Sequence, residues 1–385
     1  MKAPSFSNPR SGRSTVQRLT WACLLLLAVP TSGLANTFVV NSTNDPGDGG
    51  CNTTECTLRE ALTAANANPG PDVIAFDIPG TGVRTIRPLT QLPAITEALT
   101  VDGTTQPGFA GLPLIELDGS LAVADSPGAA GLRLEAGGCE VRGLVVNRFA
   151  FCGIFLAAGD GSRIAGNFLG TDAAGAVSLG NGSGGSILVS GGSNGHRIGG
   201  TVAADRNVIS PVGTGINCQG GERLVIQGNY IGTDVTGTTA LANPTGLAVY
   251  AGIDLRGADC QVGGPGTGEG NLISGCRGPN PSEWWRNGAG IVATAPGSLI
   301  QGNRVGTDAT GMLGIPNELG INAGGTDMQI GGTEPGAGNL ISGNGFHGLS
   351  LGSRNTAQGN LIGTDITGLA VLPNGGIGIG ISGSD

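Results

Sequence analysis

The sequence GNFLGTD at Gly166–Asp172 recurs three more times along the chain. The further copies are GNYIGTD, GNRVGTD and GNLIGTD, which begin at Gly228, Gly302 and Gly359. A second phrase alternates with the first, NVIS once and NLISG twice, beginning at Asn207, Asn271 and Asn339. Each copy of this second phrase follows a Gly-Gly pair. Self-similarity at this density indicates an array in which one structural unit stacks on the next.

The recurrent asparagines set the length of the repeat unit. The two shortest intervals, from Asn207 to Asn229 and from Asn339 to Asn360, define a coil of about 21 residues. The interval that begins at Asn271 is about half as long again, and the other three are close to twice as long. We interpret these three longest intervals as two coils each, which gives a larger repeat of three coils. The interval that begins at Asn271 then has to extrude a loop that contains RGPNPSEWWRN at positions 277–287.

A coil of this length accommodates three short strands and their turns, which predicts an all-β parallel β-helix. About 13 coils at ~4.8 Å per coil would make a rod roughly 60 Å long. The composition agrees with a turn-rich β protein, since 75 of 385 residues are Gly and 12% are charged, against about 7% and about 25% in ordinary domains. The 39% hydrophobic content argues against simple disorder.

The charge balance excludes some partners. The formal net charge is −9, and Lys2 is the only lysine. An acidic chain without clustered basic residues does not suit nucleic acid or an anionic membrane surface.

The N-terminal segment 1–35 has the pattern of a signal peptide. Basic residues precede a short apolar run, Trp21–Val29, and small residues lead to a predicted cleavage site after Ala35. The apolar run is shorter than the roughly 20 residues that span a bilayer, and no later segment is long and apolar enough to do so. We therefore expect a secreted or cell-surface protein.

The segment 36–93 differs from the repeats that follow it over 94–385, and we interpret it as an N-terminal cap. Thr57 and Glu60 form a capping-box pattern at the start of a predicted helix over 57–66. Its apolar stripe, Leu58, Ala61, Leu62 and Ala65, would cover the open end of a β stack.

The cysteines of an exported chain are candidates for disulfides. Cys51 and Cys56 are close in sequence, and we expect them to form a local disulfide. The other cysteines after the signal segment are interpreted as small buried core residues, namely Cys139, Cys152, Cys218, Cys260 and Cys276.

The stretch Cys56-Thr-Leu-Arg-Glu-Ala61 resembles the CSLREA motif, with Thr57 where the motif has Ser. This motif names a domain at the start of exported bacterial proteins. VDGTTQPG at 101–108 and the GNxxGTD repeats resemble the β-helix arrays that accompany that domain. The resemblance implies a right-handed parallel β-helix on an exported bacterial protein, with a CSLREA-type cap over 36–93, and it supplies no catalytic residues.

The repeated polar residues have structural interpretations. The aspartates of the GNxxGTD phrases would be turn formers that bond their own backbone: Asp172, Asp234, Asp308 and Asp365. At three coils apart they would be about 14 Å from one another, too far for a shared calcium ion or a glycosidase pair. The asparagines of both phrases are expected to stack as an amide ladder. We therefore expect no cofactor and no metal, because the repeat spacing does not support calcium.

The best binding candidate is the extruded loop. Trp284 and Trp285, next to Arg286, could stack on sugar rings or anchor a partner. Two function classes remain open. The first is a non-catalytic surface scaffold that adheres to a host or neighbouring surface or binds extracellular polysaccharide, and the second is a polysaccharide lyase, hydrolase or epimerase. The regular repeats favour the scaffold. For an arginine-based lyase, Arg223 and Arg304 would be the candidates.

Overall fold

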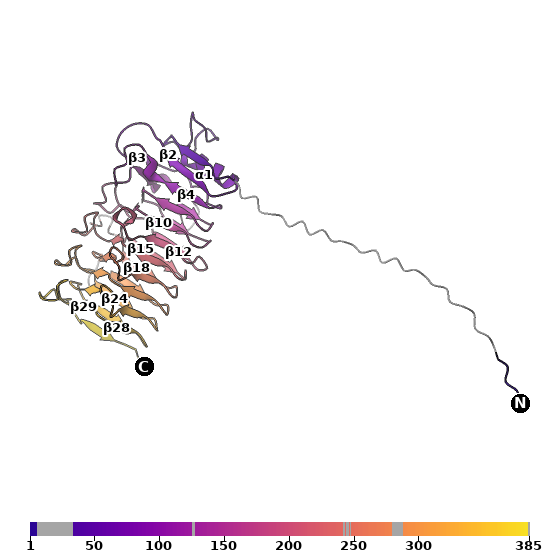
Figure 1. Cartoon of the computed structure of the whole chain (residues 1–385). Coiled ribbons are helices and arrows are strands. Elements are labelled where there is room, and N and C mark those ends of the chain that lie inside the picture. Colours follow the sequence, from indigo (N-terminus) through magenta and orange to yellow (C-terminus); the bar gives the residue numbers. More distant parts are fainter. Residues whose placement is uncertain are drawn as a thin grey trace. The chain divides into compact units, whose positions relative to one another are not determined.

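The structure is a computed structural model that describes residues 1–5, 34–124, 128–241, 243, 246, 248–278 and 288–383. Residues 33–385 form one compact unit, and all that follows concerns this unit. Its described strands form three long parallel sheets, and all three run along the same stack of coils (Figure 1).

Sheet 1 has 11 strands: β1 (Thr37–Val40), β2 (Asp72–Phe76), β4 (Leu99–Asp102), β7 (Glu140–Arg142), β10 (Arg163–Ala165), β13 (Arg197–Gly199), β16 (Val225–Gln227), β19 (Gln261–Gly263), β22 (Leu299–Gln301), β25 (Gln329–Gly331) and β28 (Thr356–Gln358). Sheet 2 has 10 strands: β3 (Arg84–Ile86), β5 (Ile115–Asp118), β8 (Leu144–Asn147), β11 (Phe168–Leu169), β14 (Val208–Ile209), β17 (Tyr230–Ile231), β20 (Leu272–Ile273), β23 (Arg304–Val305), β26 (Leu340–Ile341) and β29 (Leu361–Ile362). Sheet 3 has 9 strands: β6 (Ala130–Leu134), β9 (Cys152–Leu156), β12 (Gly185–Ser190), β15 (Gly213–Gln219), β18 (Val249–Leu255), β21 (Ala289–Ala293), β24 (Leu319–Ala323), β27 (Leu349–Leu351) and β30 (Ile379–Ile381).

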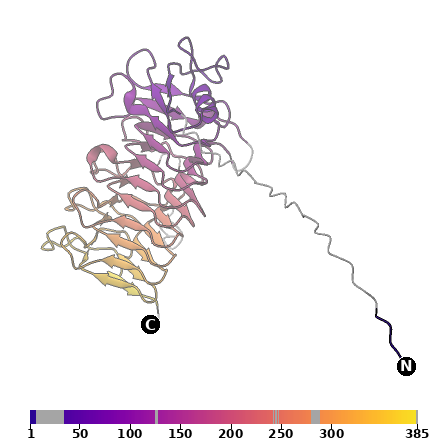
Figure 2. The same cartoon turned by 45° about the vertical axis from the view of Figure 1, so that its right-hand side comes forward.

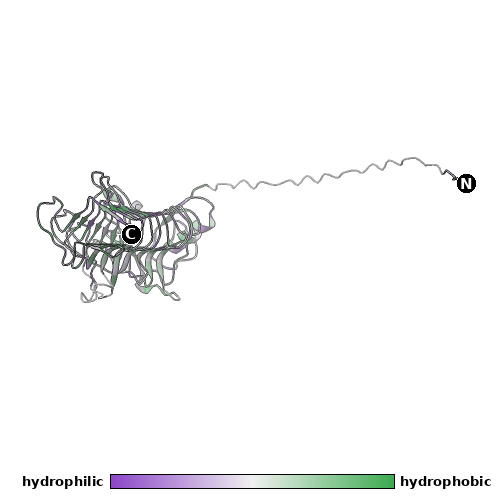
Figure 3. Cartoon of the chain, turned by 90° about the horizontal axis from the view of Figure 1, so that it is seen from below, coloured by the Kyte–Doolittle hydropathy of each residue, from purple (hydrophilic) through white to green (hydrophobic). Residues whose placement is uncertain are grey.

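From β4 onward, consecutive strands visit the three sheets in turn, and each strand pairs in parallel with the strand three places later. This is the topology of a parallel β-helix, as the sequence predicts. The turned view shows the same ladder of strands from another side (Figure 2). Seen from below, loops extend outward from the stacked strands (Figure 3).

The core lies between the three sheets, where alternate residues of each strand point inward. In sheet 3, isoleucines occupy one inward position in six consecutive strands and stack in register: Ile154, Ile187, Ile216, Ile253, Ile291 and Ile321. All six are at most 1% exposed. Such a column buries apolar surface continuously along the stack, at roughly 25 cal/mol per Å².

The predicted coil length of about 21 residues holds only for the shortest coils. Phe168 pairs directly with Val208, and Val208 pairs with Tyr230, so a long interval and a short one each span a single coil. The interpretation of the three longest intervals as two coils each, and of a three-coil repeat, was therefore wrong. The stack has at most 11 described rungs in any sheet, fewer than the number of coils predicted. The additional residues lie in loops at the corners.

One set of these loops explains why the two phrases alternate. After the GNxxG part of the phrase, the chain folds back on itself through an antiparallel bridge, such as Thr171 with Ser178 or Thr307 with Gly314. Loops from every second coil then bond to one another, with Val235 N donating to Gly175 O at 2.9 Å. The equivalent bonds are Ala309 N to Gly237 O at 2.8 Å and Ile366 N to Gly311 O at 3.0 Å.

This column of loops covers the outer face of sheet 2. Val145, Phe168 and Val208 point outward from the sheet yet are at most 4% exposed, because Ala173 and Val235 of the loops pack on them. The loops therefore form a second layer, and their period is two coils.

The predicted asparagine ladder is confirmed. Asn167, Asn207, Asn229, Asn271, Asn303 and Asn339 are at most 1% exposed. Each side-chain amide donates to the carbonyl oxygen of the next asparagine, at 2.9 to 3.2 Å, and the run ends on Asn360. A second ladder, which the sequence analysis missed, joins Asn317 to Asn344 at 3.0 Å and Asn344 to Asn374 at 2.9 Å.

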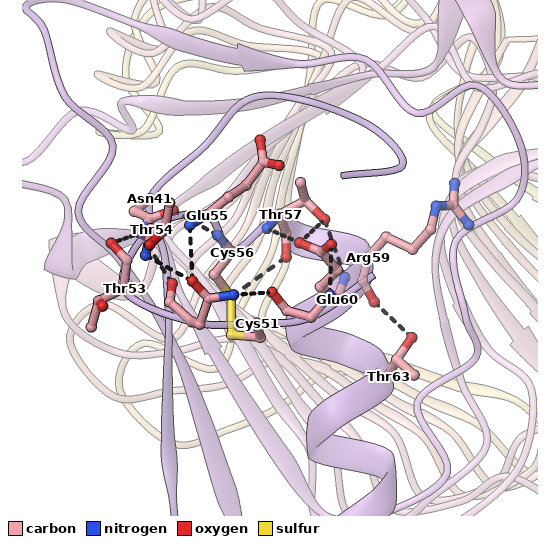
Figure 4. The surroundings of a disulfide bond; sticks show 12 residues. Asn41, Cys51, Thr53, Thr54, Glu55, Cys56, Thr57, Arg59, Glu60 and Thr63 are labelled. Atoms are coloured by element: carbon pink, nitrogen blue, oxygen red, sulfur yellow. Dashed lines mark hydrogen bonds between the residues drawn. A yellow bond between two sulfur atoms is a disulfide. The ribbon is translucent and has the colours of Figure 1, made fainter. Parts of the chain in front are cut away.

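The N-terminal helix α1 (Leu58–Ala67) begins at a capping box. Glu60 N donates to Thr57 Oγ1 at 3.3 Å, and Thr57 N donates to Glu60 Oε2 at 2.8 Å. The predicted apolar stripe is buried and joins the main core cluster. Cys51 and Cys56 form the disulfide that the sequence predicts, next to this cap (Figure 4). In the described part of the chain, no helix is long and apolar enough to cross a membrane.

His196 is a structural residue of the corner between β12 and β13. It is 0% exposed, its Nδ1 accepts from Ser162 N at 3.0 Å, and its Nε2 lies 2.7 Å from Ser193 Oγ. Because Ser193 Oγ donates to Gly159 O, Nε2 carries the proton and Nδ1 does not. Burial lowers the pKa of His196, so the folded state holds the neutral ring.

We predict that Asn271→Ala strongly destabilises the stack. Asn271 accepts from Asn229 N and Nδ2 and donates to Ile226 O and Asn303 Oδ1. Each buried partner left unsatisfied costs about 1–3 kcal/mol, so the midpoint of denaturant unfolding should fall markedly. The control is Asn360→Ala at the last rung of the ladder, where the side chain is partly exposed and its removal lets water reach the groups that it bonded. Equal losses in the two variants would contradict the buried-ladder interpretation.

We predict a fall in stability between pH 7.5 and 5.5 that depends on His196. The unfolded chain binds a proton near pH 6.5, while the folded state resists it because its pKa is lowered. The free energy of unfolding therefore decreases as the pH drops through 6.5, by at most about 1.4 kcal/mol per pH unit. Thermal unfolding of His196→Gln should not show this dependence of stability on pH, whereas the control His347→Gln should keep it. An unchanged pH dependence in His196→Gln would refute the assignment to His196.

Candidate functional site

The predicted contact loop with Trp284, Trp285 and Arg286 lies outside the described residues. The chain enters this loop from Arg277, whose Nε donates to Glu318 Oε1 at 3.0 Å, and leaves it at Gly288, just before β21. These flanking residues lie between β20 of sheet 2 and β21 of sheet 3.

The repeated aspartates are turn formers, as predicted. In each GNxxGTD loop one carboxylate oxygen accepts from the backbone N–H groups four and five residues later. Asp308 Oδ1, for example, accepts from Met312 N at 3.0 Å and Leu313 N at 3.2 Å. Their predicted spacing of three coils was wrong, because they recur every second coil, about 10 Å apart at ~4.8 Å per coil. Their turn role rests on these hydrogen bonds instead.

Arg223 and Arg304 do not form a shared site. Arg223 lies in a turn with a positive φ of 55° and pairs with its neighbour Glu222 at 3.1 Å. Arg304 belongs to β23 of sheet 2, between Leu272 and Leu340 in the ladder.

A different cluster gathers charged side chains on the outer face of sheet 1. The strand register places Asp102 beside Arg142 and Glu140 beside Arg163. Arg142 Nη2 bonds to Asp102 Oδ2 at 2.5 Å, and Arg163 Nη1 bonds to Glu140 Oε1. Side chains of opposite charge therefore alternate along three neighbouring strands.

A 3₁₀ turn, η3 (Ala203–Asp205), adds a further carboxylate to this cluster. Asp205 Oδ1 accepts from Arg163 Nη2 at 2.6 Å. The next residue, Arg206, lies over the ring of Tyr230 at 4.0 Å from its centroid. We call Asp102, Glu140, Arg142, Arg163 and Asp205 the charged cluster.

Three residues of the charged cluster, Arg142, Arg163 and Asp205, line two adjoining hollows. One, of about 330 Å³, has Arg142, Asp205 and Arg206 on its polar side and an apolar wall formed by Phe109, Leu112, Phe168 and Val235. The other, of about 180 Å³, is lined by polar groups that include Arg163, Arg197, Thr201 and Gln227. Asp205 lines both hollows, so they share this residue in their walls.

Hydrogen bonds within the cluster favour the charged forms of Asp102 and Arg142. Burial acts to raise the pKa of Asp102, but hydrogen bonds from Arg142 and Thr104 outweigh it and lower that pKa. The hydrogen bond to Asp102 raises the pKa of Arg142. A carboxylate with a lowered pKa holds its charge at neutral pH, whereas a general acid for glycoside cleavage needs a raised pKa.

This cluster was not predicted from the sequence. Outward polar residues in β7 and β10 gave a signal, since Glu140, Arg142 and Arg163 alternate with inward Val141 and Ile164. Their partners could not be assigned, because the loops between strands differ in length and hide the register.

No family model matches the chain, and no curated protein matches it. Among solved structures, pectate lyase Pel9A is similar with a TM-score of 0.35 and 14% identity, over 89% of this chain and 82% of that one. The Dettilon tailspike protein is similar with a TM-score of 0.29 and 15% identity, over 89% of this chain and 59% of that one. At these values the fold assignment rests on the three sheets of the chain itself.

Proposed function

We propose that this chain is an exported, non-catalytic β-helix scaffold that binds polysaccharide in the two hollows around the charged cluster. The observation that supports it most directly is the alternation of arginine and carboxylate groups beside an apolar wall. Sugar hydroxyls both donate and accept hydrogen bonds, so they match a surface that offers donors and acceptors in turn. The apolar faces of sugar rings suit a wall that contains aromatic side chains.

The size and position of the hollows support the same proposal. A volume of about 330 Å³ is at the lower end of the range for small-ligand sites, about 300–1,000 Å³. The second hollow shares Asp205 with it. An extended chain of sugars, more than a single compact ligand, would use both.

Catalysis is the less favoured function for this site. Its carboxylates are engaged by Arg142 and Arg163, and the pKa of Asp102 is shifted in the wrong direction for a general acid. The loop with Trp284 and Trp285 stays in the proposal as a second contact on the polysaccharide.

We predict that Arg163→Ala/Asp205→Ala binds polysaccharide at least tenfold more weakly than the unmodified chain on a glycan and polysaccharide array. The double substitution removes Arg163 together with Asp205, and Glu140, which also bonds to Arg163, is partly exposed and can be solvated by water. The change therefore reports mainly lost contacts to the ligand. The matched control is Asp327→Ala/Arg354→Ala, which removes an exposed ion pair of 2.7 Å near the other end of the stack.

The same array separates the alternatives. Unchanged binding in Arg163→Ala/Asp205→Ala together with loss in Trp284→Ala/Trp285→Ala would move the site to the loop and refute the charged cluster. Release of unsaturated or reducing sugars from the bound polysaccharide, with or without calcium, would overturn the non-catalytic assignment.

A further inference from the structure

Two cysteines meet inside the stack at the corner where sheet 3 passes into sheet 1. Cys218 lies near the end of β15, and Cys260 immediately precedes β19 in the next coil. They are 0% and 1% exposed, and the structure holds both as thiols.

The two sulfurs share the same surroundings. Cys218 Sγ donates to Gly221 O at 2.9 Å, and Cys260 Sγ lies 3.7 Å from the same oxygen. Cys260 Sγ also lies 3.5 Å from Gly257 O, and Gly257 belongs to the next coil and approaches Cys218 Sγ closely. The two sulfurs are therefore neighbours across one pair of coils.

The backbone of this corner is fitted closely around the sulfurs. A Cβ at Gly257 would lie 1.7 Å from Gly221 O and 3.1 Å from Cys218 Sγ. Glycine at this position lets the two successive coils approach each other, and this approach brings the thiols together.

The three other reduced cysteines in the described part of the chain lack this arrangement. Cys139 Sγ bonds to the carbonyl oxygens of Glu97, Ala136 and Gly137. Cys152 packs in a small apolar cluster, and for Cys276 burial alone raises the pKa. None of the three bonds to a second thiol in the described residues.

We propose that Cys218 and Cys260 form a second disulfide that ties two successive coils together when the chain folds under oxidising conditions. In the cell this requires the export that we propose above, since disulfides persist in oxidising compartments. The linkage itself is a property of the chain and does not depend on polysaccharide binding.

The oxidant is a second disulfide, either oxidised glutathione or a thiol–disulfide oxidoreductase. The thiolate of one of the two cysteines attacks one sulfur of that disulfide and expels the other as a thiolate, which gives a mixed disulfide. The other cysteine, after losing its proton, then attacks the sulfur of the first cysteine and expels the second thiolate. The two cysteines lose two electrons and two protons, and the oxidant becomes two thiols. Since the folded corner is buried, the exchange takes place while the chain folds.

The test refolds the full chain in a glutathione redox buffer and, in parallel, under a phosphine reductant. Eight cysteines less the two of Cys51–Cys56 leave six thiols. We expect the soluble, folded protein from the glutathione buffer to show four thiols per chain after denaturation. Peptide mapping of the alkylated protein should give one peptide pair linked through Cys218 and Cys260.

Stability supplies a second measurement. The apparent Tm of the oxidised protein should exceed that of the reduced protein, since a crosslink restricts the unfolded chain. This difference in Tm should be several degrees larger in the unmodified chain than in Cys218→Ala. Cys276→Ala is the matched control, because it also removes a buried sulfur but should keep the full difference. Comparing oxidised and reduced forms of the same variant cancels the packing loss. Six thiols in the folded oxidised protein, or a different pairing, would overturn the proposal.

Discussion

The structure depends on the need to satisfy every buried amide along the rod. An asparagine inside the stack has two donor hydrogens and a carbonyl oxygen that water cannot reach, and each must find a partner or destabilise the fold. The next coil supplies that partner in the form of an identical asparagine. The ladder therefore fixes the register between coils, and the strands can be as short as two residues because they do not set it alone.

Several elements could be predicted from the sequence because their signals are local. The phrases that contain Asn207 and Asn229 identify the ladder, and the pair of Thr57 and Glu60 identifies the start of α1. The number of coils could not be predicted in the same way. Sequence distance between two asparagines counts the residues of the coil and of its loops together, and nothing in the sequence separates them.

The same limit hid the second ladder and the charged cluster. Asn317, Asn344 and Asn374 occur in phrases that differ from one another, so only their stacking reveals what they share. Asp205 reaches Arg163 from the loop that follows β13, in the next coil, and a pairing of this kind follows from the register. Local patterns thus determine the elements, while corner loops of variable length determine which side chains meet.

The loop column on sheet 2 links coils that are not adjacent. In a simple solenoid each unit contacts only its neighbours, so unfolding behaves as a one-dimensional chain with nearest-neighbour coupling. Here Val235 bonds to Gly175 across an intervening coil, and Ala309 bonds to Gly237 in the same way. This adds next-nearest-neighbour coupling to the chain, so a break between two coils also has to separate the loops that bridge it. Partly unravelled rods should consequently be less populated than the length of the array alone would suggest.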